Sequence, residues 1–159
     1  MVGEDTRMYG NRMKSKHKQN LIDMKKFIDR NGRHDESQIT SIKKTKYDEE
    51  VLLCRPEKDD DLAIIRLILG NKDPSNHIRL IIWDDVMDIA DIQILKEEYL
   101  SRGYGTLLMK EAIDLARRRG IKKIIGNLYT IDEENDKRQQ NFYKKFGFTI
   151  DEGKLILEL

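Results

Sequence analysis

The stretch YLSRGYGTLLMKEAIDLARRRG, residues 99–120, places two glycines two positions apart immediately before a helical pattern of apolar residues. Gly103 and Gly105 have no Cβ, so the backbone there can adopt unusual φ and ψ angles and can come close to a ligand. The helix that we expect to begin near Tyr104 leaves its first amide N–H groups without intrahelical partners and carries the positive end of its dipole at that point. The turn therefore favours an anion and suits a pyrophosphate, with Arg102 as a nearby cation.

Two common phosphate-binding signatures do not fit this turn. The P-loop needs a lysine after its last glycine, but Gly105 is followed by Thr106 and Leu107. The dinucleotide-binding fingerprint needs a third glycine, where this chain has Leu108. A simpler interpretation, in which the glycines only make a tight turn between a strand and a helix, stays open on these residues alone.

The segments on either side of the turn predict one α+β domain with a mixed sheet. Before the turn, three segments rich in Ile and Leu predict an antiparallel meander with a tight turn at Asp84 and Asp85: residues 62–69, 78–85 and 86–95. The first of them could instead belong to a helix over 59–70 that is capped by an aspartate. Residues 38–55 predict two short strands or one bent strand. After the turn, strands and helices alternate: helix 104–119, strand 122–130, helix 136–146 and a closing strand over 148–159.

Residues 1–35 predict a basic N-terminal helical extension that packs on a domain formed by residues 36–159. Apolar residues recur at helical spacing between Gly10 and Arg30 and provide a stripe for docking: Met13, Leu21, Met24, Phe27 and Ile28. The same segment is rich in Lys and Arg, so an anionic partner such as nucleic acid is an alternative. We favour a solvated basic face, because the apolar stripe is what a helix docked on the domain requires.

The composition suits a single compact domain, because the 159 residues are 38% hydrophobic and 37% charged. The net charge of +1 gives no global reason to expect nucleic acid or an anionic membrane. The sequence shows no signal peptide and no apolar run long enough to span a membrane, which predicts a cytoplasmic protein without a membrane partner.

Few residues outside the glycine turn have the pattern of a site. Cys54 is the only cysteine, which excludes an internal disulfide, and its apolar neighbours predict a buried thiol. The three histidines lack metal-ligand spacing, so no metal is expected: His17, His34 and His77. Trp83 falls in a strand pattern and is expected in the core rather than as a stacking platform.

Two motifs together resemble the GCN5-related N-acetyltransferase (GNAT) family: RGYGTLLM (102–109), which follows ADIQIL (90–95), and NFYKKFGF (141–148). The resemblance covers residues 38–159. It implies a mixed, mainly antiparallel central sheet flanked by helices, with the N-terminal helix as an addition. The family's central motif reads Q/R-x-x-G-x-G/A, and this chain matches both small positions but has Leu100 at the first, which cannot make the polar contact of Gln or Arg.

The resemblance also implies that acetyl-CoA is the acetyl donor. The amides of residues 101–106 would cradle its pyrophosphate, and the backbone of residues 94–96 would pair with the pantetheine arm. The arm would lie between strands 86–95 and 122–130, which splay apart in this family. The implied cofactor-binding residues are Ile94, Leu95, Lys96, Ser101, Arg102, Gly103, Tyr104, Gly105 and Thr106.

Acyl transfer from a thioester to an amine needs a proton for the leaving thiolate and a way to neutralise the ammonium. Tyr143 matches the position where many family members carry the tyrosine that protonates the thiolate. The alternative is a packing aromatic, but Phe142 and Phe146 are expected to form the packing stripe of this helix, with Tyr143 off it. Asp91 resembles the glutamate that the histone acetyltransferase branch uses as a base, although its spacing to the glycines is shorter by two residues; an ordinary edge carboxylate is the alternative.

The sequence thus predicts an acetyl-CoA-dependent N-acetyltransferase in which a primary amine attacks the thioester directly. The amine would belong to a small molecule or to a protein. A non-catalytic module that binds or senses acyl-CoA is the alternative, with Leu100 as a trace of weakened catalysis. A nucleic-acid-associated protein that uses the basic helix is a less favoured alternative. The protein is expected to be a monomer or a homodimer. The acidic residues of 132–136 could attract a cationic amine, although a solvated loop explains them as well.

Overall fold

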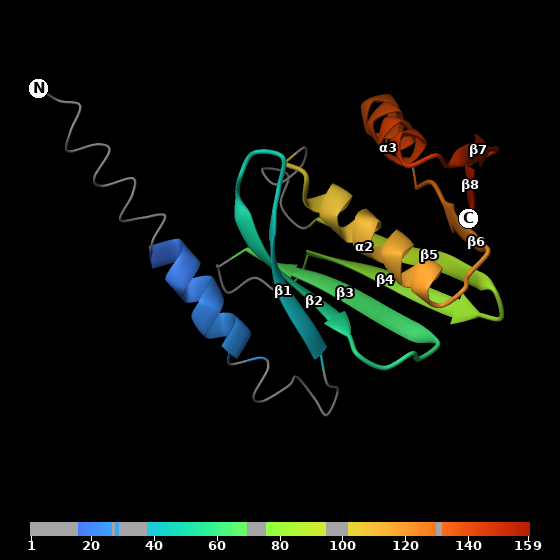
Figure 1. The fold of residues 1–159 in the computed structure, drawn as a ribbon. Helices are drawn as coiled ribbons and strands as arrows, with labels where there is room; N and C mark the ends of the chain where they lie inside the picture. Colours follow the sequence, from blue (N-terminus) through green and yellow to red (C-terminus); the bar gives the residue numbers. More distant parts are fainter. Residues whose placement is uncertain (1–15, 27, 29–37, 70–75, 95–101, 130–131) are drawn as a thin grey trace, which may run out of the picture.

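The computed structural model describes residues 16–26, 28, 38–69, 76–94, 102–129 and 132–159. Its strands form one mixed sheet in the order β1-β2-β3-β4-β5-β6-β8-β7, in which β5 and β6 pair in parallel and all other neighbours are antiparallel. The strands are β1 (Gln38–Lys44), β2 (Glu50–Pro56), β3 (Leu62–Ile68), β4 (Asn76–Trp83), β5 (Val86–Gln93), β6 (Lys123–Asn127), β7 (Thr149–Asp151) and β8 (Lys154–Glu158). Two helices follow β5, namely α2 (Tyr104–Arg118) and α3 (Glu133–Lys145) (Figure 1). The predicted mixed, mainly antiparallel α+β fold is confirmed.

Several element predictions are settled by this arrangement. Residues 62–68 form β3, so the alternative helix over 59–70 is wrong. Residues 38–55 form two strands rather than one bent strand. The closing segment is a hairpin and not a single strand, because Glu152 and Gly153 adopt positive φ values of 47° and 76° and reverse the chain between β7 and β8.

Helix α2 covers one face of the sheet and buries its apolar stripe there (Figure 1). Leu108, Met109 and Ala112 are fully buried in the main core, together with the inward-facing residues of β3 and β4, such as Ile65 and Leu80. Side chains alternate along a strand, so the neighbours of these residues point to the other face. Trp83 is one of them and is 44% exposed, which makes its predicted place in the core wrong.

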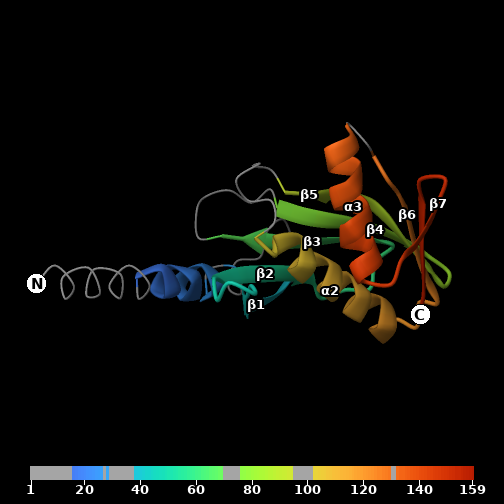
Figure 2. The same cartoon turned by 90° about the horizontal axis from the view of Figure 1, so that it is seen from above.

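The N-terminal helix packs on the opposite face from α2, at the β1–β2 end of the sheet. Residues 16–26 and Ile28 are helical, and Leu21 and Ile28 are buried against Leu52, Cys54 and Ile68. This helix and α3 lie at opposite ends of the molecule in both views (Figure 2). The expected docking stripe and the buried Cys54 thiol are therefore observed, whereas Met13 and Phe27 lie outside the described residues. The boundary at residue 35 stays a prediction.

The sheet opens between β5 and β6. The two strands pair from Val86–Lys123 to Ile89–Gly126, and among the described residues their pairing ends there. A Cβ on Gly126 would lie 3.3 Å from Leu155 Cδ1 and 3.5 Å from Ile89 Cβ, so the glycine permits the close approach at the last pair. Beyond Ile89, β5 continues along β4 alone, and the space between the diverging strands is the candidate site.

Candidate active site

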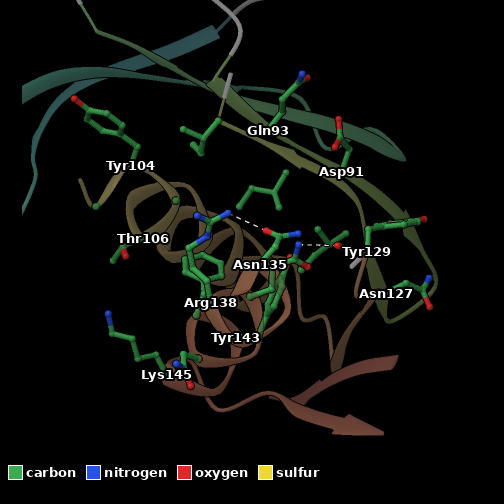
Figure 3. A pocket seen from close by; sticks show the side chains of 18 of the residues that line it. Asp91, Gln93, Tyr104, Thr106, Asn127, Tyr129, Asn135, Arg138, Tyr143 and Lys145 are labelled. Carbon is green, nitrogen blue, oxygen red and sulfur yellow. Dashed lines mark hydrogen bonds between the residues drawn. The ribbon is translucent and has the colours of Figure 1, made fainter. Parts of the chain in front are cut away.

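A cavity of about 950 Å³ lies where β5 and β6 diverge. Its walls are residues 89–94 of β5 and its end, residues 103–106 at the start of α2, Asn127 at the end of β6 with Tyr129 beyond it, and one side of α3. Figure 3 shows Asp91 and Gln93 on the β5 wall and Asn135, Arg138 and Tyr143 on the α3 wall. A cavity of this size is typical of sites for cofactor-sized ligands.

The glycine turn leaves the start of α2 open to an anion. Gly103 has φ 89° and ψ 6°, no side chain caps the helix, and its first turn contains no acidic residue. The start of α3 is different, because the Asp132 carboxylate accepts a hydrogen bond from the Asn135 amide at 2.7 Å and acidic residues fill the first turn. The acidic run 132–136 thus caps and begins a helix, whereas α2 presents its amides and the positive end of its dipole to the cavity.

The β1–β2 turn holds the glycine turn in place. The Tyr104 hydroxyl donates to Glu49 Oε2 and Oε1, with oxygen–oxygen distances of 2.7 and 2.8 Å, and Tyr104 is 1% exposed. Burial, followed by the hydrogen bond and charge of Glu49, raises the pKa of Tyr104 well above its ordinary value, against the opposing effect of Arg102. Tyr104 therefore anchors the first turn of α2 to a segment that lies 55 positions earlier in the chain.

Basic side chains outnumber acidic ones in the cavity wall. Lys46, Arg138 and Lys145 line it, and Asp91 is the acidic residue among the lining residues. Arg138 is held by the Asn135 side-chain oxygen at 2.8 Å (Figure 3). None of these three cations was identified from the sequence. The spacing of seven between Arg138 and Lys145 places them on one helix face and was an available signal, but nothing local marked Lys46.

Tyr143 lies in the cavity wall but does not have the surroundings expected from the sequence. It is 5% exposed and is the buried residue of α3, with edge-to-face ring contacts to Phe142 and Phe148 at 5.2 and 5.5 Å between centroids. Phe142 and Phe146 are only partly buried, so the expectation that Tyr143 lies off the packing stripe is wrong. Burial, with a smaller contribution from the charge of Asp91, raises the pKa of Tyr143 to about 12.

A β-bulge decides which face of the sheet carries Asp91. Leu80 pairs with Ile89, but the next residue of β4, Arg79, pairs with Asp91, so Ala90 is an extra residue in β5. The bulge places Asp91 on the same sheet face as Arg79 and His77, and His77 Nε2 lies 3.3 Å from Asp91 Oδ2. The Asp91 side chain is 43% exposed and the His77 side chain is 14% exposed.

The remaining predicted residues fall into three groups. Ile94, Gly105 and Thr106 line the cavity together with Gly103 and Tyr104. Arg102 is exposed and acts on the Tyr104 hydroxyl rather than lining the cavity. Leu95, Lys96, Leu100 and Ser101 lie outside the described residues.

No group of three or more His, Cys, Asp or Glu side chains in the described part of the chain is arranged to hold a metal ion. No helix there is both long enough and apolar enough to cross a membrane.

Comparison with known proteins identifies the class to which this fold and site belong. The profile of the Acetyltransferase (GNAT) family matches residues 22–148. The chain therefore belongs to the GNAT acetyltransferase family, whose members are acyltransferases. No curated protein sequence matches the chain significantly.

Solved structures share the fold at low sequence identity. The PaiA N-acetyltransferase from Thermoplasma acidophilum, in complex with coenzyme A, is 21% identical with a TM-score of 0.50, over 60% of this chain and 58% of that one. A GNAT acetyltransferase from Elizabethkingia anophelis with acetyl-CoA bound is 20% identical with a TM-score of 0.51, over 62% and 77%. A cAMP-binding acyltransferase from Mycobacterium smegmatis is 13% identical with a TM-score of 0.59, over 76% and 47%. The chain thus spans little more than half of the first protein and about half of the third.

Proposed function

We propose that this chain is an acetyl-CoA-dependent N-acetyltransferase that acts on a primary amine by direct attack. One observation carries the proposal: Tyr143 and Asp91 stand on different walls of a cavity that also contains an uncapped helix N-terminus with cations around it. The first pair suits proton transfer, and the second feature suits a phosphate-containing donor. Family membership and the coenzyme-bound structures of similar fold support the same donor.

The residues at the glycine turn fit coenzyme A. The amides at the start of α2 would hold its pyrophosphate, and Lys46, Arg138 and Lys145 would offset its negative charge. The backbone at Ile94, just past the end of β5, would pair with the pantetheine amides, since among the described residues β6 pairs with β5 only as far as Ile89. When bound, acetyl-CoA supplies an acetyl group activated as a thioester. Leu95, Lys96, Arg102 and Ser101 complete the proposed set on the family resemblance alone.

The two catalytic candidates have separate tasks. The Asp91 carboxylate attracts the cationic amine and accepts its proton. The Tyr143 hydroxyl, with a pKa of about 12, stays protonated throughout the neutral range and can donate to the leaving sulfur as negative charge develops there. A raised pKa makes the phenol a weaker acid, so Tyr143 would lower the barrier partly by donating a hydrogen bond to the developing thiolate and not only by transferring its proton.

Thiol release from acetyl-CoA tests the proposal. The wild-type chain is incubated with acetyl-CoA and each of n-butylamine, benzylamine, tyramine and a lysine-containing peptide, and the rate without amine is subtracted. We expect amine-dependent thiol release and the mass of the acetylated amine. Tight coenzyme binding by calorimetry without any amine-dependent release would instead favour the non-catalytic acyl-CoA module. Failure to bind acetyl-CoA at all would contradict both.

A cytoplasmic location and a monomeric or homodimeric state stay predictions from the sequence. The apolar side of the N-terminal helix is occupied by the sheet, as the docking interpretation expects, and only its polar side is left for an anionic partner.

A further inference from the structure

The pairing of His77 with Asp91 links the cavity to a histidine on the neighbouring strand. The two residues come from neighbouring strands, β4 and β5, and their side chains share one sheet face because of the Ala90 bulge. Nε2 of His77 lies 3.3 Å from Oδ2 of Asp91. Asp91 lines the cavity, whereas His77 does not and is mostly covered.

The side chains that surround His77 in the sheet keep a constant charge over the pH range in which the protein is folded. Arg66 on β3 and Gln93 on β5 stand beside His77 in the sheet register, and Arg79 follows it on the same face of β4. The two guanidinium groups stay charged and the amide stays neutral at any pH that the protein tolerates. Histidine, in contrast, ordinarily changes its charge between about pH 5 and 8.

We propose that His77 is a positioning residue that makes recognition of the amine depend on pH, an inference that rests on the proposed function. When the imidazole is neutral, the Asp91 carboxylate keeps its negative charge for the acceptor ammonium. When the imidazole is protonated, it forms an ion pair with the same carboxylate and competes with the ammonium for it. The site thus prefers a cationic amine and loses affinity for it as the pH falls.

Steady-state kinetics with the fastest amine of the panel test this competition at saturating acetyl-CoA. In the wild type, the KM for the amine should rise about threefold or more as the pH falls from about 8 to 5.5, while kcat changes less. A threefold change in KM is the size of effect expected from a partly exposed ion pair. His77→Gln keeps an amide donor but carries no charge, so its KM should be nearly constant over this range and close to the wild-type value at pH 8. His77→Ala should also remove the dependence of KM on pH, but its KM at about pH 8 should lie above the wild-type value, because Asp91 loses the neighbour that positions its carboxylate.

A matched control comes from a second histidine. His17 lies on the N-terminal helix, where its Nε2 is 2.9 Å from the carbonyl oxygen of Glu50 on β2, and His17 does not line the cavity. His17→Gln should keep the wild-type dependence of KM on pH. A His77→Gln variant that also keeps this dependence would overturn the inference while leaving the acetyltransferase proposal intact.

A second readout does not need turnover. Imidazole nitrogen shifts of the protein saturated with coenzyme A are recorded by NMR at about pH 6, where histidine is commonly part-protonated, with and without n-butylamine. The amine should move the His77 signals, assigned by their loss in His77→Gln, toward the neutral form, and Asp91→Asn should abolish the change. If no amine is ever acetylated, the proposed function fails, and this measurement alone decides the inference: unmoved His77 signals overturn it.

Discussion

Replacement of Gly103 by valine should separate the coenzyme cradle from the stability of the fold. Gly103 has φ 89° and ψ 6°, which a β-branched residue does not tolerate. A Cβ there would lie 3.7 Å from Thr45 Cβ and 3.8 Å from Lys46 Cγ, which is ordinary contact, so the strain is in the backbone and not in crowding. The left-handed conformation costs a residue with a side chain about 1–2 kcal/mol, and more for valine.

The turn can relieve this strain only by rotating the amides that would hold the pyrophosphate. Restoring them on binding costs the same free energy, so the Kd for acetyl-CoA should rise about fivefold to thirtyfold or more. Gly103→Asn should bind nearly as the wild type, because asparagine tolerates the left-handed conformation.

Gly120 provides the matched control for this substitution. It has φ 70° at the other end of α2, and a Cβ there would meet nothing within 4 Å. Gly120→Val should therefore lower the free energy of unfolding, measured in urea, without changing the Kd measured by calorimetry. If the Kd of Gly103→Val lies within about twofold of the Gly120→Val value, the cradle is not at this turn.

Three further predictions concern Tyr143 and Lys46. Tyr143→Phe keeps the ring packing but removes the proton donor, so kcat should fall about 100-fold with little change in coenzyme affinity, whereas Tyr47→Phe, on an exposed ring, should not change kcat. Burial raises the pKa of Tyr143 to about 12, above the ordinary value of about 10, so the neutral phenol stabilises the fold below about pH 10 and this contribution disappears as the pH rises to about 12; urea unfolding of Tyr143→Phe should depend less on pH across this interval. Lys46→Gln should weaken coenzyme binding about threefold, and added salt should reduce the difference from the wild type; an equal difference at low and high salt would argue against a phosphate contact.

The sequence predicts the helices and strands of this fold well where the spacing of apolar residues and the positions of turn residues agree. The helix after Gly103 and the meander with its turn at Asp84 and Asp85 follow from residues that are close together in the chain. The closing hairpin was not predicted, because the residue that reverses the chain with Gly153 is Glu152, and glutamate is not a typical residue at positive φ.

The site is harder to predict because its geometry depends on long-range register. Counted outward from the turn at Asp84 and Asp85 without a bulge, Asp91 would stand opposite Ile78, on the buried face. One extra residue, Ala90, moves Asp91 to the other face beside His77, and no local pattern in the sequence marks a bulge at an alanine. The prediction that Tyr143 lies off the packing stripe of α3 was wrong for a related reason. The spacing of aromatic residues on one helix does not reveal which of them the neighbouring strands cover.

The bond between Tyr104 and Glu49 means that the binding site is completed by the beginning of the sheet. The glycine motif is continuous in the sequence, but its first turn is fixed by the β1–β2 hairpin and faced by Arg138 and Lys145 near the other end of the chain. A fragment that starts after β2 would keep every residue of the motif and still lack one support of the helix start. The ability to hold a ligand would therefore require the first hairpin and α3 together, so a change that loosens either of them would weaken binding at an unaltered glycine motif.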